Sequence, residues 1–220
     1  MTTTVRAIGA AAEGAQMAPM DIIRRTPEPT DVRIAITHSG ICHSDIHTVR
    51  GEWGDRPYPL VPGHEIVGKV IEVGSEVTKY KVGDVVGVGV IVDSCGECEN
   101  CQNNDENYCS GPVGPRLTYG EPEPQLPGQV TQGGYAQEIV TTENFVYRIP
   151  EGLDLAGVAP LLCAGITVYS PLKHWGAAPG KTVGVVGIGG LGHMAVKFSH
   201  ALGAHTVALT SSSEKVALGT

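Results

Sequence analysis

Short runs of alternating or β-branched hydrophobic residues, separated by turn residues, fill residues 1–150. The clearest runs are Asp31–Thr37, Glu65–Val73 and Val82–Val92. In the first run Val32, Ile34 and Ile36 fall on one face, as expected of a strand with one buried side. Gly111–Gly134 is rich in Pro and Gly without an apolar period, so we expect a long surface loop there. The first 150 residues are therefore predicted to form a mainly β, antiparallel domain.

The pattern changes after Pro150, where helical and strand periods alternate. The predicted elements are, in order, helical pieces within Leu153–Val168, a strand over Thr182–Val186, a helix over Leu191–Ala201 that Gly203 ends, and a strand over His205–Leu209. A strand, a glycine-rich turn, a helix and a second strand form a βαβ unit, which implies a parallel sheet. The predicted fold class is α/β with a mainly β domain over residues 1–150 and a second domain over residues 151–220.

The charge of the chain argues against two classes of partner. Fifteen Lys and Arg residues stand against 23 Asp and Glu residues, a formal net charge of −8. Such a chain does not neutralise phosphates, so we expect no nucleic-acid partner and no binding to an anionic membrane. The uncharged stretch Leu155–Leu172 approaches the length of a membrane-spanning helix, but Gly and Pro interrupt it and we expect buried protein there.

Six cysteines without a credible export signal favour a reducing, cytoplasmic compartment and metal-binding or catalytic thiols. Four of them, Cys95, Cys98, Cys101 and Cys109, have the spacing C-x2-C-x2-C-x7-C. Four thiolates fill the tetrahedral shell of zinc with no open position, which predicts a structural site. An iron–sulfur cluster is the first alternative, although ferredoxin runs have a shorter last gap followed by Pro, where this chain has Ser110. Disulfides are the second alternative and need an oxidising compartment.

A second metal site is indicated by Cys42, His64 and Cys163. Two sulfurs and one imidazole leave a fourth zinc position for water or substrate, the arrangement of a catalytic site. Spacing alone does not bring these three residues together. A lone Cys163 in an apolar helix is also typical of a small core residue, and a lone His64 of a structural hydrogen-bonding residue.

The segment Gly187–Gly192 has the pattern G-x-G-x-x-G between a β-branched strand and a helix, the context that dinucleotide binding requires. Gly187 permits the tight turn, Gly189 lets the backbone approach a pyrophosphate, and Gly192 lets the helix pack on the strand. Gly190 and Leu191 lie in the same predicted cofactor turn. A glycine-rich turn without a ligand is the alternative.

The end of the second strand distinguishes NAD(H) from NADP(H). An NAD-binding unit usually has Asp or Glu there for the ribose 2′-hydroxyl, whereas this chain has Ser211, Ser212 and Ser213, followed by Glu214 and Lys215. Hydroxyls and an ammonium group suit a 2′-phosphate, so we expect NADP(H). The nearby Glu214 and a merely solvated Lys215 are the arguments against it.

Five motifs occur together and in order. They are Gly40-Ile41-Cys42-His43-Ser44-Asp45-Ile46-His47, Pro62-Gly63-His64-Glu65, the four-cysteine segment, Leu161-Leu162-Cys163-Ala164-Gly165-Ile166-Thr167, and Gly187–Gly192. With these motifs the chain resembles the zinc-containing medium-chain alcohol dehydrogenases, most closely the cinnamyl-alcohol-dehydrogenase branch of NADP-dependent aldehyde reductases. The resemblance implies a GroES-like catalytic domain over residues 1–150 and the beginning of a Rossmann (doubly wound parallel) NADP-binding domain over residues 151–220.

The resemblance also implies roles for single residues. The catalytic zinc would be held by Cys42, His64 and Cys163 with Glu65 close enough to join, and the structural zinc by Cys95, Cys98, Cys101 and Cys109. The proton relay would comprise Ser44 and His47; Asp45 would support the zinc-bound histidine, His43 would contact a cofactor phosphate, Thr167 would lie on the nicotinamide side, and Trp53 would line the substrate pocket. A helix cap is the alternative role for Ser44 and Asp45.

The implied reaction is hydride transfer between NADP(H) and a primary alcohol/aldehyde pair, with broad specificity and aldehyde reduction as the expected direction. Two zinc ions per chain and NADP(H) are the implied cofactors, a small-molecule alcohol or aldehyde is the substrate, and a homodimer is the common assembly. Zinc would polarise the carbonyl, and the proton would pass through Ser44, the cofactor ribose and His47.

The number of residues after Pro150 is too small for a complete nucleotide-binding domain. Lys181 to Thr220 is 40 residues, enough for one βαβ unit, whereas a doubly wound domain has about six strands. We expect an incomplete, truncated nucleotide domain with an unpaired sheet edge and an exposed apolar face. The alternative function is a truncated, non-catalytic, zinc-stabilised binding or assembly module.

Overall fold

The computed structural model describes residues 2–54, 56–112, 114–212 and 215. The chain divides into two compact units, Met1–Leu162 and Cys163–Thr220. The domain boundary expected after Pro150 stays a prediction.

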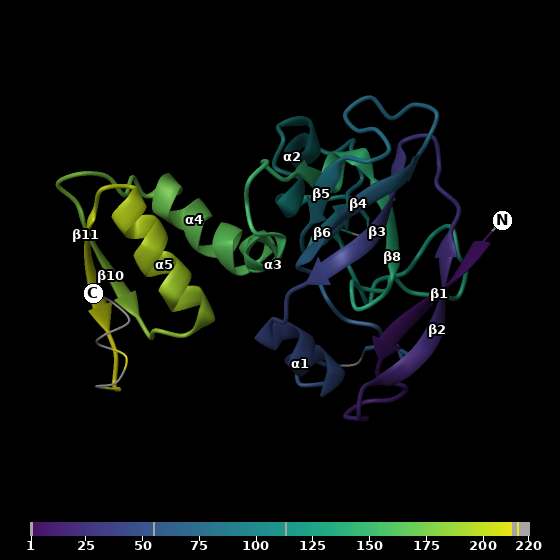
Figure 1. Ribbon diagram of the computed structural model, residues 1–220, viewed down its shortest axis with the longest axis horizontal. Helices are drawn as coiled ribbons and strands as arrows, with labels where there is room; N and C mark the ends of the chain where they lie inside the picture. Colours follow the sequence, from purple (N-terminus) through teal and green to yellow (C-terminus); the bar gives the residue numbers. More distant parts are fainter. Residues whose placement is uncertain (1, 55, 113, 213–214, 216–220) are drawn as a thin grey trace. The chain divides into compact units, whose positions relative to one another are not determined.

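Within the described part of the first unit, the largest sheet has five antiparallel strands in the order β8-β3-β4-β5-β9 (Figure 1). Their bounds are Asp31–Ser39 (β3), Ile66–Val73 (β4), Val85–Val88 (β5), Glu138–Thr142 (β8) and Val146–Arg148 (β9). Val32 and Ile34 are fully buried in the core of this sheet, and Ile36 packs against that core. The predicted antiparallel β domain and the buried face of Asp31–Thr37 are confirmed.

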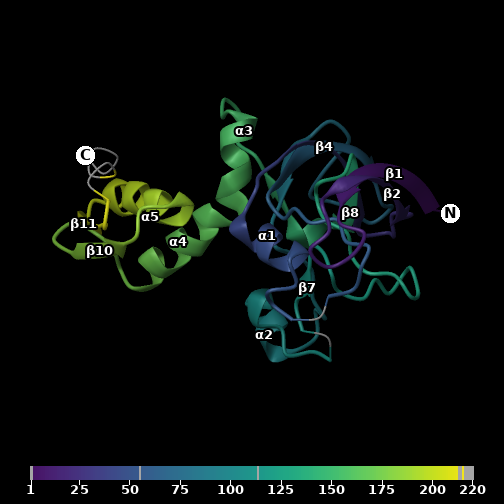
Figure 2. The ribbon, with the colours of Figure 1, turned by 90° about the horizontal axis from the view of Figure 1, so that it is seen from below.

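Two smaller antiparallel ribbons complete the β structure described in this unit. Strands β1 (Thr2–Gly9) and β2 (Ala18–Arg25) form the curved ribbon near the N-terminus (Figure 2). Strands β6 (Ile91–Asp93) and β7 (Arg116–Leu117) form the other.

Two sequence predictions in this unit need correction. The run Val82–Val92 contains two strands, β5 and β6, which Gly89 and Val90 separate. The backbone passes close to another segment there, since a Cβ atom on Gly89 would lie 2.9 Å from the carbonyl oxygen of Leu162. Gly111–Gly134 is not wholly a surface loop, since it contains β7 and the buried side chains of Thr118 and Thr131.

The helices of the first unit are short. They are α1 (His43–Val49), α2 (Glu99–Gln102) and α3 (Leu155–Val158), with 3₁₀ turns at Glu106–Tyr108, Glu143–Phe145 and Ala159–Leu162. Asp154 caps α3, because its carboxylate accepts the N–H groups of Ala156 and Gly157.

The second unit is a βαβ unit preceded by one helix. Its elements are α4 (Ala164–His174), β10 (Thr182–Val186), α5 (Gly190–Ala201) and β11 (His205–Leu209). β10 and β11 pair in parallel, as predicted, and α5 lies beside α4 with the rings of Tyr169 and Phe198 5.5 Å apart (Figure 1). Trp175, Val186 and Leu209 are exposed apolar side chains of this unit.

No single helix in the described ranges is long and apolar enough to cross a membrane. The consecutive helical segments Leu155–Leu162 and Ala164–His174 together pass that test by length and composition only.

A buried arginine ties β2 to β8 and to the segment before it. The guanidinium of Arg24, which is 7% exposed, donates to the carbonyl oxygens of Gln132 at 2.5 Å, Gly133 at 2.7 Å and Glu138 at 2.9 Å. Burial lowers the pKa of Arg24 to about 10. The guanidinium therefore supplies the hydrogen bonds that these three carbonyl groups would otherwise accept from water.

We expect Arg24→Ala to lower the free energy of unfolding by about 3–5 kcal/mol, because the carbonyl groups it bridges lose a charged donor. Urea unfolding measures the change. Arg6→Ala removes an exposed arginine from the neighbouring strand β1 and is the matched control, expected within about 0.5 kcal/mol of the unsubstituted protein. Equal losses for the two variants would show that Arg24 has no such role.

Candidate functional site

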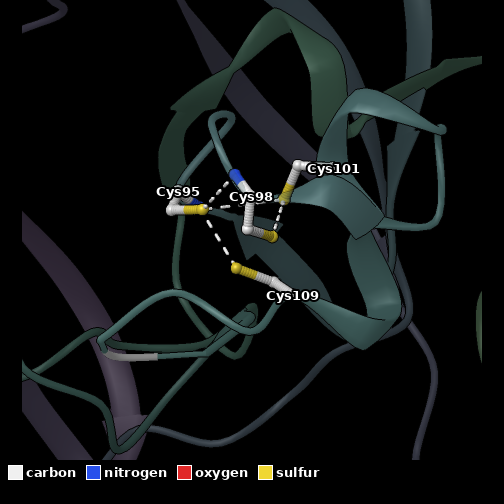
Figure 3. A group of neighbouring side chains, drawn as sticks. All are labelled: Cys95, Cys98, Cys101 and Cys109. Atoms are coloured by element: carbon white, nitrogen blue, oxygen red, sulfur yellow. Dashed lines mark hydrogen bonds between the residues drawn. The ribbon is translucent and has the colours of Figure 1, made fainter.

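Four cysteines converge in the segment between β6 and β7. Cys98 lies directly before α2 and Cys101 within it, while Cys109 follows the 3₁₀ turn at Glu106–Tyr108. Figure 3 shows the four side chains, including that of Cys95, directed toward one another. All four sulfur atoms lie within 4.8 Å of one another.

The distances between these sulfurs fit one tetrahedral metal ion. Sγ of Cys101 lies 3.4 Å from Sγ of Cys98 and 3.9 Å from Sγ of Cys95. Four sulfurs at about 2.3 Å from a zinc ion would be about 3.8 Å apart. A disulfide bond is about 2.0 Å long, and none of the four cysteines forms one.

Backbone N–H groups point at the same sulfurs. Sγ of Cys95 accepts the N–H of Cys98 at 3.3 Å, and Sγ of Cys98 accepts the N–H of Ser110 at 3.4 Å. Hydrogen bonds from the backbone around Cys101 and Ser110 lower the pKa of Cys98 to about 5. These donors favour the thiolate, the form that binds a metal.

A second group of metal-binding side chains forms around the start of α1. Cys42 immediately precedes α1, and His64 and Glu65 immediately precede β4. Cys163, the residue after Leu162, belongs to the same group, and the ligand atoms of all four residues lie within 4.8 Å of one another. His64 is 3% exposed, so its ring is held by protein groups and not by solvent. Residues that the sequence could not connect by spacing thus lie together.

The carboxylate of Asp45 organises this second group. Asp45 is 2% exposed and lies in the first turn of α1. Its Oδ1 accepts the Nδ1–H of His64 at 2.9 Å and the N–H of Gly63 at 3.0 Å, and its Oδ2 accepts the N–H of Cys42 at 3.0 Å. Because Nδ1 of His64 is bound to Asp45, Nε2 is the ring nitrogen that faces the group and would bind a metal.

Two tyrosine hydroxyls complete the surroundings of Asp45, and sequence reasoning missed both. Tyr119 donates to Oδ1 at 2.9 Å, and Tyr135 lies 2.9 Å from Oδ2. Burial, and then the charge of Asp45, raise the pKa of each phenol, so both remain O–H donors. Burial alone would raise the pKa of Asp45, but hydrogen bonds from His64 and its other donors outweigh burial and lower it.

The predicted relay residues share α1. Oγ of Ser44 lies 3.5 Å from Sγ of Cys42. His47 is hydrogen-bonded through Nδ1 to Glu52, and its ring stacks on Trp53 with centroids 5.1 Å apart. Trp53 is 53% exposed.

His43 is exposed, with its ring centroid 4.6 Å from that of His47. Thr167 is also exposed, in the first turn of α4.

The glycine-rich turn connects β10 to α5. Gly187 has φ of +82°, which favours glycine, and its N–H donates to the carbonyl oxygen of Leu209 at the end of β11. Gly190, Leu191 and Gly192 form the first turn of α5, where backbone N–H groups remain available for an anion. A Cβ atom on Gly192 would lie only 1.9 Å from the carbonyl oxygen of Gly187.

Ser211 and Ser212 follow β11 at the same end of the parallel pair as the glycine turn. Lys215 is exposed, and its N–H donates to the carbonyl oxygen of Ser212. Ser213 and Glu214 lie outside the described residues. The carboxyl ends of parallel strands are where nucleotides bind in such sheets.

Comparisons with known proteins show the family of the chain. A family model described as the alcohol dehydrogenase GroES-like domain matches residues 28–151, more than half of the chain. The aldehyde reductase YahK of Escherichia coli (strain K12) is 58% identical over 212 residues, which are 96% of this chain and 60% of the relative. The NADP-dependent alcohol dehydrogenase C 1 of Mycolicibacterium smegmatis is 55% identical over 214 residues, with coverages of 97% and 60%.

Two solved structures are similar along almost the whole chain. A cinnamyl alcohol dehydrogenase of Sorghum bicolor has a TM-score of 0.93 and 45% identity, and the match covers 99% of this chain and 63% of that one. The CAD of Helicobacter pylori complexed with NADP(H) has a TM-score of 0.93 and 40% identity, with coverages of 100% and 64%. The chain thus spans about 60% of the length of the curated relatives it matches.

Gly192→Ala should unfold the second unit at a lower temperature than in the unsubstituted protein, because the new methyl group meets the backbone of Gly187. Hydrogen exchange of the amides of β10 and α5 localises the effect. Gly190→Ala is the matched control, since its Cβ atom would have no neighbour among the described residues within 4 Å. Equal protection in both variants would contradict the close approach at Gly192.

Proposed function

The chain belongs to the zinc-containing medium-chain alcohol dehydrogenases, in the cinnamyl-alcohol-dehydrogenase-like branch, and from this premise we propose that it transfers hydride between NADP(H) and a primary alcohol/aldehyde pair, chiefly as an aldehyde reductase. The observation that carries the proposal is the group of Cys42, His64, Glu65 and Cys163. Two thiols and one imidazole leave room at a zinc ion for a substrate oxygen. The names of the similar proteins, an aldehyde reductase and an NADP-dependent alcohol dehydrogenase, support the same reaction.

The donor chemistry fits two zinc ions with different tasks. The four thiols of Cys95, Cys98, Cys101 and Cys109 would enclose one ion and stabilise their segment. Cys42, His64 and Cys163, with Glu65 beside them, would hold the catalytic ion. When bound there, zinc supplies a Lewis acid that polarises a carbonyl oxygen. Asp45 holds the His64 ring through Nδ1, so Nε2 is the nitrogen that would bind the ion.

Ser44 and His47 would move the proton. They lie three residues apart on α1 and so share one face of the helix. The Ser44 hydroxyl lies beside Sγ of Cys42 and can donate or accept a proton there. Because Nδ1 of His47 is hydrogen-bonded to Glu52, Nε2 is the nitrogen left to exchange a proton. The half-exposed ring of Trp53, stacked on His47, would offer an apolar surface to the substrate.

The second unit would hold NADP(H). The N–H groups of Gly189, Gly190, Leu191 and Gly192 at the start of α5 suit a pyrophosphate. Ser211, Ser212 and Lys215 suit a 2′-phosphate, and Ser213 belongs to the same proposal. His43 would contact a cofactor phosphate and Thr167 the nicotinamide side. A homodimer in the cytoplasm remains the predicted assembly and location.

We expect the purified protein to oxidise NADPH in the presence of aliphatic or aromatic aldehydes, faster than it oxidises NADH. A chelator should abolish the activity and Zn²⁺ should restore it, since the reaction depends on the metal. Cys42→Ser should lose the activity together with one of two zinc ions per chain, whereas Ser170→Ala, at an exposed serine of α4, should keep both.

Two results would contradict the proposal. Two bound zinc ions with no NADPH oxidation on any aldehyde would favour a non-catalytic zinc-stabilised module. A rate with NADH above that with NADPH would overturn the choice of cofactor.

A further inference from the structure

We propose that Tyr119 and Tyr135 are positioning residues for the metal site, acting through the carboxylate of Asp45. The inference rests on the proposed function, because it concerns the catalytic metal group of Cys42, His64, Glu65 and Cys163. Neither tyrosine belongs to that group, and neither lies in a motif that identifies the family in this sequence.

The two phenols hold opposite oxygens of one buried carboxylate. Tyr119 donates to Oδ1 at 2.9 Å, the oxygen that also accepts Nδ1–H of His64. The hydroxyl of Tyr135 lies 2.9 Å from Oδ2 and, less closely, 3.2 Å from the carbonyl oxygen of Gly40. With a donor on each side, the carboxylate of Asp45 cannot turn about its Cβ–Cγ bond without losing a hydrogen bond.

Both tyrosines are anchored by distant segments of the first unit. Tyr119 follows Thr118, whose N–H donates to the carbonyl oxygen of Val90. The carbonyl oxygen of Tyr135 accepts the N–H of Ile8, and the N–H of Tyr135 donates to the carbonyl oxygen of Pro62. The two segments lie 74 and 90 residues from Asp45 in sequence, so the sheet, and not local chain geometry, sets where the hydroxyls lie.

Each tyrosine also contacts the segment that carries His64. The Tyr119 hydroxyl lies 3.3 Å from Nδ1 of His64, and the two ring centroids are 5.8 Å apart. Gly63 has φ of +102°, and a Cβ atom there would lie 2.7 Å from the ring of Tyr135. The two tyrosines therefore position the Asp45 carboxylate, which accepts the hydrogen bond of the His64 ring, and the backbone at Gly63, directly before His64.

Removing these hydroxyls should lower the zinc affinity of the group of Cys42, His64, Glu65 and Cys163. The zinc affinity of the four cysteines should not change. Loss of an outer hydrogen bond to a metal-binding histidine typically costs 10–100-fold in metal affinity. Phenylalanine keeps the ring packing and removes only the donor. Among the described residues, neither tyrosine hydroxyl is hydrogen-bonded to any of the four cysteines, so zinc bound there serves as an internal reference.

The test uses the zinc-loaded protein and its variants Tyr119→Phe, Tyr135→Phe and the double variant, titrated with a chelator while both zinc equivalents are followed. We expect each single substitution to lower the affinity for the catalytic zinc ion roughly 10-fold, and the double substitution up to about 100-fold. The affinity for the zinc ion on the four cysteines should not change. The visible spectrum of the Co²⁺-substituted protein should shift in parallel. Tyr147→Phe, at a half-exposed tyrosine of β9, is the matched control and should match the unsubstituted protein.

Unchanged release of both equivalents and an unchanged cobalt spectrum in the two single variants would overturn the inference. If the double variant does not fold, zinc release and the cobalt spectrum of the two single variants test the inference. Failure of the proposed function gives a different result: the unsubstituted protein would then bind two zinc ions and oxidise no NADPH with any aldehyde, while zinc release from the tyrosine variants would still decide this inference.

Discussion

Burying a carboxylate costs several kcal/mol unless hydrogen bonds replace the water it loses. Asp45 meets that constraint with donors from four separate segments: the start of α1, the approach to β4, the residue after Thr118 and the residue after Gly134. Each segment must reach one small volume for the charge to be satisfied. Two of these segments carry Cys42 and His64, so the hydrogen bonds to Asp45 also bring these two residues together.

The two metal groups differ in how they are assembled. The four cysteines lie within one short segment, and glycines make its close turns possible: Gly96 has φ of +70°, and a Cβ atom on Gly111 would lie 2.7 Å from Cβ of Cys95. The group of Cys42, His64, Glu65 and Cys163 requires distant segments that only the folded chain brings together. In the proposed function, the local group would enclose one ion and stabilise its segment, whereas the non-local group would leave a position at its ion open for a substrate.

This difference explains what could be predicted from the sequence. The strands β10 and β11, the buried face of β3 and the cysteine spacing depend on local period, and the structure has them where expected. The split of Val82–Val92 at Gly89 and the donors Tyr119 and Tyr135 depend on contacts with distant residues, which leave no period in the sequence. The only sequence feature that pointed to these donors is a tyrosine within a Gly- and Pro-rich segment, and this feature does not show which group accepts the hydrogen bond.

The Asp45 carboxylate supports the proposed catalytic metal group, and the substitution Asp45→Asn tests this role most directly. The amide has nearly the same shape, but one of its two acceptor oxygens becomes a donor that faces N–H and O–H groups. Zinc content per chain after equilibration with a chelator is the measurement. We expect the variant to retain one zinc ion, on the four cysteines, and to lose the other. Two zinc ions retained with unchanged affinity would contradict it.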